Sequence, residues 1–172
     1  MGWKNVKEHY RIVHQVRVEE KGICIGSPYI SDIIVIGLDG VLKKRDDGHA
    51  NSNLKRYMQE FDADPEKLNR LVTTPDTFTN SVVVYTYEGS KIIEKLCETP
   101  GWPNVTHDGL MMYDNTFSTD RSKVVEFALS NAQAGVSLAT ARVGENRRRL
   151  AEAESWLAEC LADVSVLKKM QE

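Results

Sequence analysis

The chain has 172 residues, with 22 Lys and Arg residues against 25 Asp and Glu residues, and a formal net charge of −3. This length suits one domain with an extension, and the slightly acidic balance argues against a general attraction to DNA, RNA or a membrane surface. The longest apolar run, residues 33–36, is too short to cross a bilayer, and the first residues lack the apolar stretch of a signal peptide.

The first half of the chain reads as strands. Residues 10–18 alternate between polar and apolar side chains, and apolar runs follow at 23–25 and 33–36. Asp39 and Gly40 form a strong hairpin signal, because this pair tolerates the positive φ angles of a tight turn. A short return strand at 41–42 completes what we expect to be a small antiparallel meander.

Two short helices are expected next. Apolar residues at i, i+3, i+4 and i+7 predict a helix over 54–61, with Asn51 or Ser52 as its N-cap. Asp64 followed by Pro65 predicts the start of the second helix, because proline is favoured in a first helical turn.

Residues 82–87 are β-branched and aromatic and predict another strand. After Gly89 and Ser90 we expect a helix that ends at residues 100–101. Four of its side chains would face the core: Ile92, Ile93, Leu96 and Cys97. A loop over 102–109 and a short strand over 110–113 follow. Ser118 or Thr119 is then expected to cap a long helix, with Asp120 supporting its positive end.

This long helix carries a seven-residue repeat. One set of layers contains Leu129, Val136, Val143, Leu150, Leu157 and Val164, and the alternating set contains Ala132, Ala139, Asn146, Ala153, Cys160 and Leu167. A strict heptad repeat gives a stripe that is too narrow for a globular core and suits one facing helix. The repeat therefore predicts self-association through the C-terminal helix.

Three features bear on how this apolar stripe, which we call the seam, could pair with another helix. Asn146 is a polar layer that could fix the register of a partner helix. Gly135 and Gly144 each cost about 1 kcal/mol in a helix interior, so Gly144 could also be the turn of a helical hairpin that packs on its own domain. Glu145 and Arg149 stand four residues apart and predict an exposed ion pair.

Cys24, Cys97 and Cys160 are widely separated and include no Cys-x-x-Cys pair. This pattern favours a reducing compartment and argues against a disulfide framework or a structural zinc site. Each cysteine is most simply a small hydrophobic residue. We therefore expect a cytoplasmic protein that has no metal and no other cofactor.

Two segments could bind a ligand. Residues 102–117 combine aromatic side chains with Asn, Asp, Thr and His, which could stack a base or ribose and read its edge. The turn at residues 26–29 is the second. For both segments, an ordinary connector or turn remains the simpler interpretation.

Signals for an enzyme are sparse. His107 and Asp108 could act as an acid–base pair, but adjacent residues on a strand point to opposite faces. The sequence contains no HExxH, Walker, Gly-x-Ser-x-Gly or GxGxxG motif. A non-enzymatic function is favoured.

Two stretches together resemble a phage-encoded family, the Thoeris anti-defence sponge proteins of the first described type. The first is ICIGSPY at residues 23–29 with IIVI at 33–36; the second is PGWPN at 100–104, THDG at 106–109 and MYDNTF at 112–117. The resemblance covers roughly residues 10–135. It implies a small sheet with long C-terminal helices that build oligomers, and binding of cyclic ADP-ribose isomers made by bacterial TIR-domain enzymes.

The resemblance also implies site residues. Asn115 and Phe117 would contact adenine or ribose, with Asp108 and Ser27 as further contacts. Arg142, with Arg147 in reserve, would meet the pyrophosphate, which needs cationic donors because burying its charges unpaired is prohibitive.

The expected architecture is α+β: a small antiparallel sheet with short helices in a ligand-binding domain over 1–118, then a long helix or helical hairpin with a heptad seam over 119–172. The leading hypothesis is an oligomer in the host bacterial cytoplasm that sequesters a small nucleotide signal and inhibits anti-phage defence. Two alternatives remain open. One is a coiled-coil factor that blocks a host protein, and the other is a nucleotide hydrolase.

Overall fold

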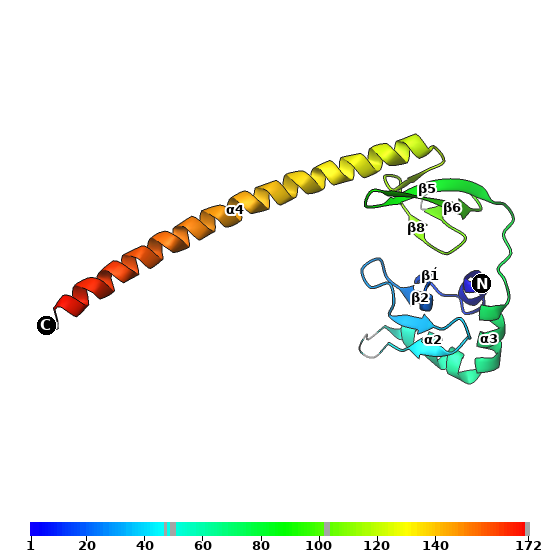
Figure 1. Ribbon diagram of the computed structural model, residues 1–172. Coiled ribbons are helices and arrows are strands. Elements are labelled where there is room, and N and C mark those ends of the chain that lie inside the picture. Colours follow the sequence, from blue (N-terminus) through cyan, green and yellow to red (C-terminus); the bar gives the residue numbers. More distant parts are fainter. Residues whose placement is uncertain (47, 49–50, 102–103, 171–172) are drawn as a thin grey trace. The chain divides into compact units, whose positions relative to one another are not determined.

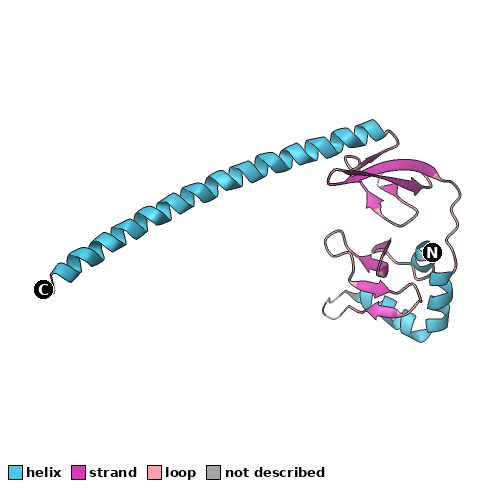
Figure 2. Ribbon diagram, in the orientation of Figure 1, coloured by secondary structure: helices cyan, strands magenta, loops and turns pink. Residues whose placement is uncertain are grey.

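The computed structural model describes residues 1–46, 48, 51–101 and 104–170. The chain divides into two compact units, residues 1–125 and residues 126–172. The first unit is an assembly of short helices and antiparallel strands, and the second is helical (Figure 1, Figure 2). The α+β prediction, with a small antiparallel sheet and a long C-terminal helix, is confirmed. No described helix is both long and apolar enough to cross a membrane.

The predicted meander is present as a four-stranded antiparallel sheet in the order β1-β2-β3-β4. Its strands are β1 (Gln15–Glu19), β2 (Gly22–Gly26), β3 (Ile34–Ile36) and β4 (Leu42–Lys44). The turn between β3 and β4 passes through Gly40, with a φ of 72°, as the hairpin signal predicted. The first strand begins later than predicted because residues 10–14 lead out of a helix that the sequence analysis missed.

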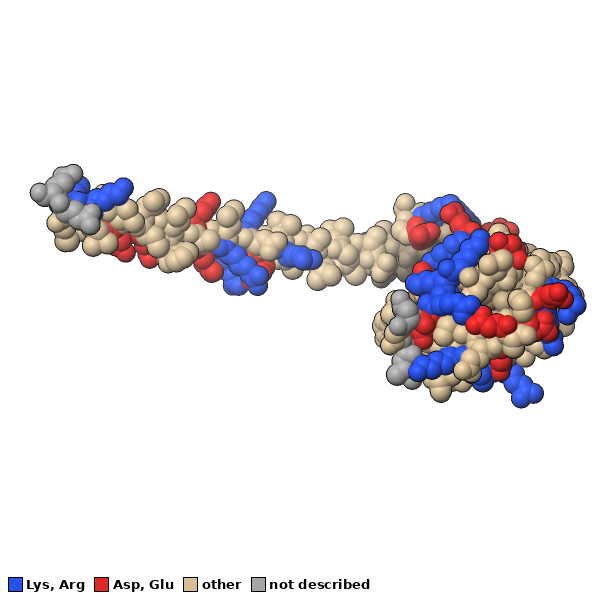
Figure 3. All heavy atoms as spheres, turned by 90° about the horizontal axis from the view of Figure 1, so that it is seen from below, with Lys and Arg blue, Asp and Glu red and all other residues tan. Residues whose placement is uncertain are grey.

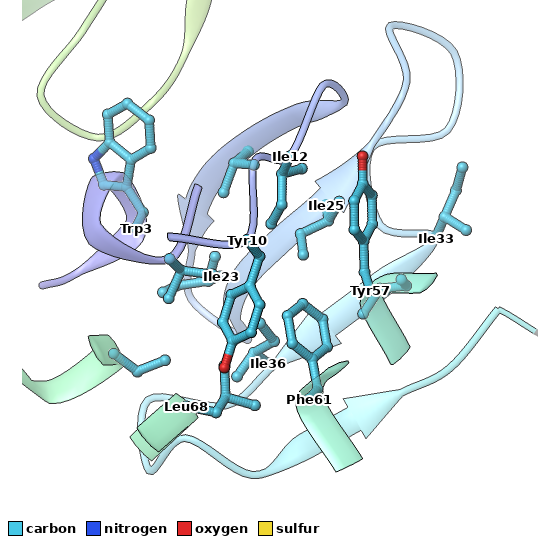
Figure 4. Packing of buried hydrophobic residues seen from close by; sticks show 14 of the residues in the cluster. Trp3, Tyr10, Ile12, Ile23, Ile25, Ile33, Ile36, Tyr57, Phe61 and Leu68 are labelled. Atoms are coloured by element: carbon cyan, nitrogen blue, oxygen red, sulfur yellow. The ribbon is translucent and has the colours of Figure 1, made fainter. Parts of the chain in front are cut away.

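That helix is α1 (Trp3–His9), and Trp3 and Val6 on one side of it are buried. The two predicted helices are present as α2 (Ser52–Ala63) and α3 (Pro65–Thr73). Asn51 caps α2 by accepting hydrogen bonds from the backbone N–H groups of Asn53 and Leu54. These helices and the meander share one core, in which Tyr57, Phe61 and the isoleucines of β2 and β3 interdigitate (Figure 4).

A second, three-stranded sheet has the order β6-β5-β9, built from β5 (Val82–Glu88), β6 (Lys91–Cys97) and β9 (Phe117–Ser118). A short two-stranded ladder joins β7 (Asn104–Val105) to β8 (Met111–Met112). The predicted helix after Gly89 is therefore wrong, because residues 91–97 form a strand. Gly89 has a φ of 58° and closes a tight hairpin, which pairs Glu88 with Lys91.

The loop over 106–109 fastens the second sheet to the meander. The backbone N–H of Val18 donates to the carbonyl of Asp108 at 2.8 Å. A Cβ at Gly109 would lie 2.3 Å from the carbonyl oxygen of Val16, and this glycine has a φ of 81°. Only glycine allows such an approach at this backbone conformation.

The C-terminal helix α4 (Arg121–Lys169) runs for 49 residues, about 72 Å at roughly 1.5 Å per residue. It begins after Asp120, whose carboxylate accepts from the backbone N–H of Ser122 at 2.8 Å, so Asp120 takes the capping position predicted for Ser118 or Thr119. The helix continues through Gly144, and the hairpin alternative is wrong. The predicted Glu145–Arg149 ion pair is confirmed, at 2.9 Å between Oε1 and Nε.

The continuity of α4 gives a test at Gly144. A Cβ added there meets no atom within 4 Å, so Gly144→Ala should raise the stability of the helix by about 1 kcal/mol. Thermal unfolding followed by circular dichroism measures the change. Ala151→Gly, on the same side of the helix one heptad later, is the matched control and should lower stability by a similar amount. A lower melting temperature for Gly144→Ala would contradict an uninterrupted helix.

Candidate functional site

One cavity of the first unit has a volume of about 340 Å³ and lies between α1 and the segment that contains β7. Its lining combines an apolar wall with several ionisable side chains: Trp3, Lys4, Lys7, Glu8, Ile12, Phe78, Glu98, Val105, Thr106 and His107. Small-molecule sites typically range from about 300 to 1,000 Å³ and pair an apolar lining with a few polar groups. We call this cavity the α1 pocket.

α1 is held in place at its N-terminal end by two hydrogen bonds. The backbone N–H of Gly2 donates to the carbonyl of Val72 at 3.0 Å, which ties the start of α1 to α3. The indole N–H of Trp3 donates to the carbonyl of His107 at 2.6 Å. Lys4 and Lys7, three residues apart on the same helix, consequently line the same cavity.

An aromatic stack forms part of the wall. The rings of Phe78 and His107 lie 3.8 Å apart between centroids, with an angle of 5° between their planes. The ammonium of Lys4 lies 5.1 Å from the centre of the Phe78 ring, and the Nε2 atom of His107 lies 3.2 Å from the carbonyl oxygen of Asn80. The stack is therefore fixed from several directions and forms a rigid aromatic part of the pocket wall.

Lys4 has its charge compensated within the pocket. It forms an ion pair with Glu98 at 3.0 Å. The same carboxylate accepts from the backbone N–H of Thr79 at 2.8 Å and from its hydroxyl at 3.1 Å. These bonds lower the pKa of Glu98 to about 2, and the hydrogen bond from the backbone N–H of Thr79 has the largest effect.

Lys7 differs from Lys4. Its side chain is half-buried, and burial lowers its pKa because the ammonium loses contact with water. Among the described residues it has no ion pair and no side-chain hydrogen bond. A cation in this position gains from a bound anion, since a charge-assisted hydrogen bond would replace the lost hydration.

The two largest of four larger cavities carry more negative than positive charge. The first, of about 590 Å³, is lined by Asp39, Asp62 and Glu66 with two arginines, and Arg45 is bound by both oxygens of Asp62. The second, of about 680 Å³, is lined by four carboxylates with Arg17 and Lys95, and both of these cations are already paired. Neither cavity suits a polyanion.

The predicted site residues do not converge on these features. Asp108 accepts from Lys95 and from the hydroxyl of Thr106. Burial alone would raise its pKa, but these two hydrogen bonds outweigh burial and lower it. His107 and Asp108 point to different partners, as expected for adjacent residues, so they form no acid–base pair with each other.

Ser27 has the role of an ordinary turn residue. Its hydroxyl accepts from the backbone N–H groups of Tyr29 and Ile30. Asn115 is exposed in the turn before β9, whereas Phe117 is half-buried and packs against the small core that contains Val84 and Met112. A ligand-binding role for these three site residues stays a prediction.

Arg142 and Arg147 are exposed on α4, in the second unit. Trp102, which belonged to the predicted aromatic and polar segment, lies outside the described residues. The α1 pocket was missed because no motif marks it. The spacing of Trp3, Val6 and Tyr10 along one helical side was the available signal for α1.

No family model, curated protein or solved structure matches this chain. Within the described residues, no group of three or more His, Cys, Asp or Glu side chains is arranged to hold a metal ion.

The low pKa of Glu98 predicts a pH dependence of stability. A carboxyl whose folded pKa lies at about 2, against an ordinary value of 4.5, stabilises the fold fully above pH 4.5 and loses this contribution as the pH falls towards 2. Glu98→Gln should therefore lower the melting temperature most at neutral pH, with the difference shrinking below pH 4.5. Glu94→Gln, an exposed change on β6, the strand that ends just before Glu98, should show no such trend.

Proposed function

We propose that the protein binds a small nucleotide-type anion in the α1 pocket and holds it without turnover. The observation that carries this proposal is the half-buried ammonium of Lys7, which has no ion-pair partner among the described residues, in a cavity that also contains a rigid aromatic stack. A nucleotide combines the two complementary features, a flat base and a negative phosphate.

The energetics of this arrangement are favourable. Stacking of a base on an aromatic side chain contributes about 1–3 kcal/mol, and a hydrogen bond to a charged group contributes about 1.5–3 kcal/mol. A pocket that is already ordered loses little conformational entropy on binding. Tight retention without reaction is therefore the expected behaviour.

The resemblance directs the choice of ligand to cyclic ADP-ribose isomers. Sequestration of such a signal would starve a downstream effector in the cytoplasm of a bacterial host and so inhibit anti-phage defence. The ionisable groups of the pocket support binding over catalysis, because Glu98 is occupied by Lys4 and Thr79, and His107 is stacked on Phe78.

Incubation of the protein with a cyclic ADP-ribose isomer, followed by removal of free ligand, heat denaturation and analysis of the released compound, tests this function. Intact nucleotide is the expected product. Altered nucleotide would identify a hydrolase, and absence of any retained nucleotide would overturn the proposal.

Lys7→Met locates the site. Loss of one charge-assisted hydrogen bond should weaken binding by roughly tenfold to a hundredfold, measured by isothermal titration calorimetry. Lys55→Met, at an exposed position on α2, is the control and should bind as the unaltered protein does. If instead Asn115→Ala or Phe117→Ala abolishes binding while Lys7→Met does not, the ligand lies at the residues that the resemblance implies.

A second candidate function is the blocking of a host protein. One face of the β5–β6 hairpin is largely apolar and uncovered in part, although the exposed Glu94 also lies on it opposite Tyr85. Val83 and Leu96 face each other across the two strands and are 37% and 41% exposed. Tyr85, Tyr87 and Ile92 share this face by register and are half-buried. Exposed apolar patches are typical of protein-binding surfaces. Leu96→Asp would abolish such binding and leave nucleotide retention unchanged.

A further inference from the structure

The seam of α4 has no partner within the second unit. Its large apolar residues are exposed, with Leu129, Val136, Leu150 and Leu157 each more than half exposed. A stripe of this length and width needs one facing helix. The charges along α4 indicate which helix could face the seam and whether that helix runs parallel or antiparallel to α4.

Charge is divided along α4. Residues 142–149 contain four arginines and one glutamate, whereas residues 152–163 contain four acidic residues and no basic one. The arginines gather near the middle of the helix, with acidic atoms nearer its C-terminal end (Figure 3). Two copies placed side by side in the same direction oppose like charges, and two copies placed in opposite directions bring each basic segment beside an acidic one.

We propose that α4 pairs with α4 of a second copy of this chain as an antiparallel coiled coil, centred between Ala151 and Glu152. This inference goes beyond the proposed function and does not depend on it. In this register the two seams overlap from Val136 to Leu167, and Leu129 lies outside the overlap.

The layers of this arrangement are complementary in size. In an antiparallel pair, each residue of the first heptad set faces one of the alternating set, so that large side chains meet small ones in three layers, while Val136 faces the partner's Leu167 at each end. Val143 faces the partner's Cys160, Leu150 faces the partner's Ala153, and Val164 faces the partner's Ala139. Alternating large and small residues across an interface fills the space evenly, whereas a parallel pair would stack alanine on alanine.

The flanking positions are complementary in charge. Arg142 lies beside the partner's Asp163, and Arg147 beside the partner's Glu154. Arg149 lies beside the partner's Trp156, where an arginine favours the aromatic face. Each contact occurs twice by symmetry, and no like charges meet at the flanking positions.

Other arrangements are less favourable. An antiparallel register one heptad nearer the N-terminus places Arg147 beside the partner's Arg147 and Arg149 beside the partner's Arg149. A parallel pair in register places Arg142 beside the partner's Arg147. The parallel pair also has attractive contacts, because it places Arg149 beside the partner's Glu154 and Asp163 beside the partner's Lys168, and Asn146 then meets its own copy. In the antiparallel pair Asn146 faces the partner's Leu157, and this polar layer weakens the pair. The antiparallel pair is still favoured, because it has no like-charge contact and no layer of alanine on alanine.

Disulfide trapping distinguishes the two directions. In the antiparallel pair, the two Cys160 residues are offset by 17 residues, about 26 Å at roughly 1.5 Å per residue, so the unaltered protein should form no interchain disulfide. Val143→Cys should be cross-linked to the partner's Cys160 on mild oxidation. Cys24 and Cys97 do not interfere, because both are fully buried.

A control variant gives opposite cross-linking results for an antiparallel and a parallel helix pair. Adding Cys160→Ser to Val143→Cys should abolish the cross-link of an antiparallel pair, but a parallel pair would still link its two introduced thiols. A disulfide between the Cys160 residues of the unaltered chains, or a monomeric mass by light scattering at micromolar concentration, would overturn the proposal.

Charge reversal provides an independent measurement. Arg142→Glu should raise the dimer Kd by roughly tenfold, because two attractive pairs become repulsive. Adding Asp163→Arg should restore the original Kd. In a parallel pair the single variant has the opposite effect: Arg142→Glu would tighten the dimer, because it then faces the partner's Arg147, and adding Asp163→Arg would weaken it again, because it then faces the partner's Lys168. Analytical ultracentrifugation at low salt measures both effects.

Discussion

The attachment of the loop over 106–109 to the elements around it is the constraint on which the first unit depends. Trp3 holds this loop from α1, and Val18 holds it from β1, both through hydrogen bonds to backbone carbonyls. Without these bonds the meander with its helices and the three-stranded sheet would be separate small layers. Each would have too little buried apolar surface to offset the entropy of ordering its chain.

The same attachment creates the α1 pocket. The carbonyl that binds Trp3 belongs to His107, so its ring is brought to Phe78 at the edge of the cavity. Both lysines of α1 then lie opposite residues that follow them in sequence by more than seventy positions. All residues that line the α1 pocket belong to the first unit, so the proposed ligand binding and the proposed pairing of α4 can be tested independently.

The parts of the fold that the sequence predicted have strong local signals. Asn51 and Asp64 mark helix starts through their capping side chains, and Gly40 marks a turn, because each acts on its immediate neighbours. Strand β6 was mistaken for a helix because Ile92, Ile93 and Leu96 also fit helical spacing, whereas the strand predicted over 82–87 is present as β5. Strand pairing depends on a partner, which no local pattern specifies. The α1 pocket had no motif for the same reason: its members meet only through tertiary contacts.

The distribution of tryptophans gives the molecule two separate optical reporters. Trp3 is nearly buried and forms part of the pocket wall, whereas Trp156 is 69% exposed on α4 beside the seam. Indole emission shifts to shorter wavelengths when water is removed, so occupation of the cavity and helix pairing would each alter a different chromophore. With Trp102 replaced by phenylalanine, the emission of Trp156 over a dilution series would follow dissociation of the paired helices. The emission of Trp3, recorded at fixed protein concentration, would follow ligand binding.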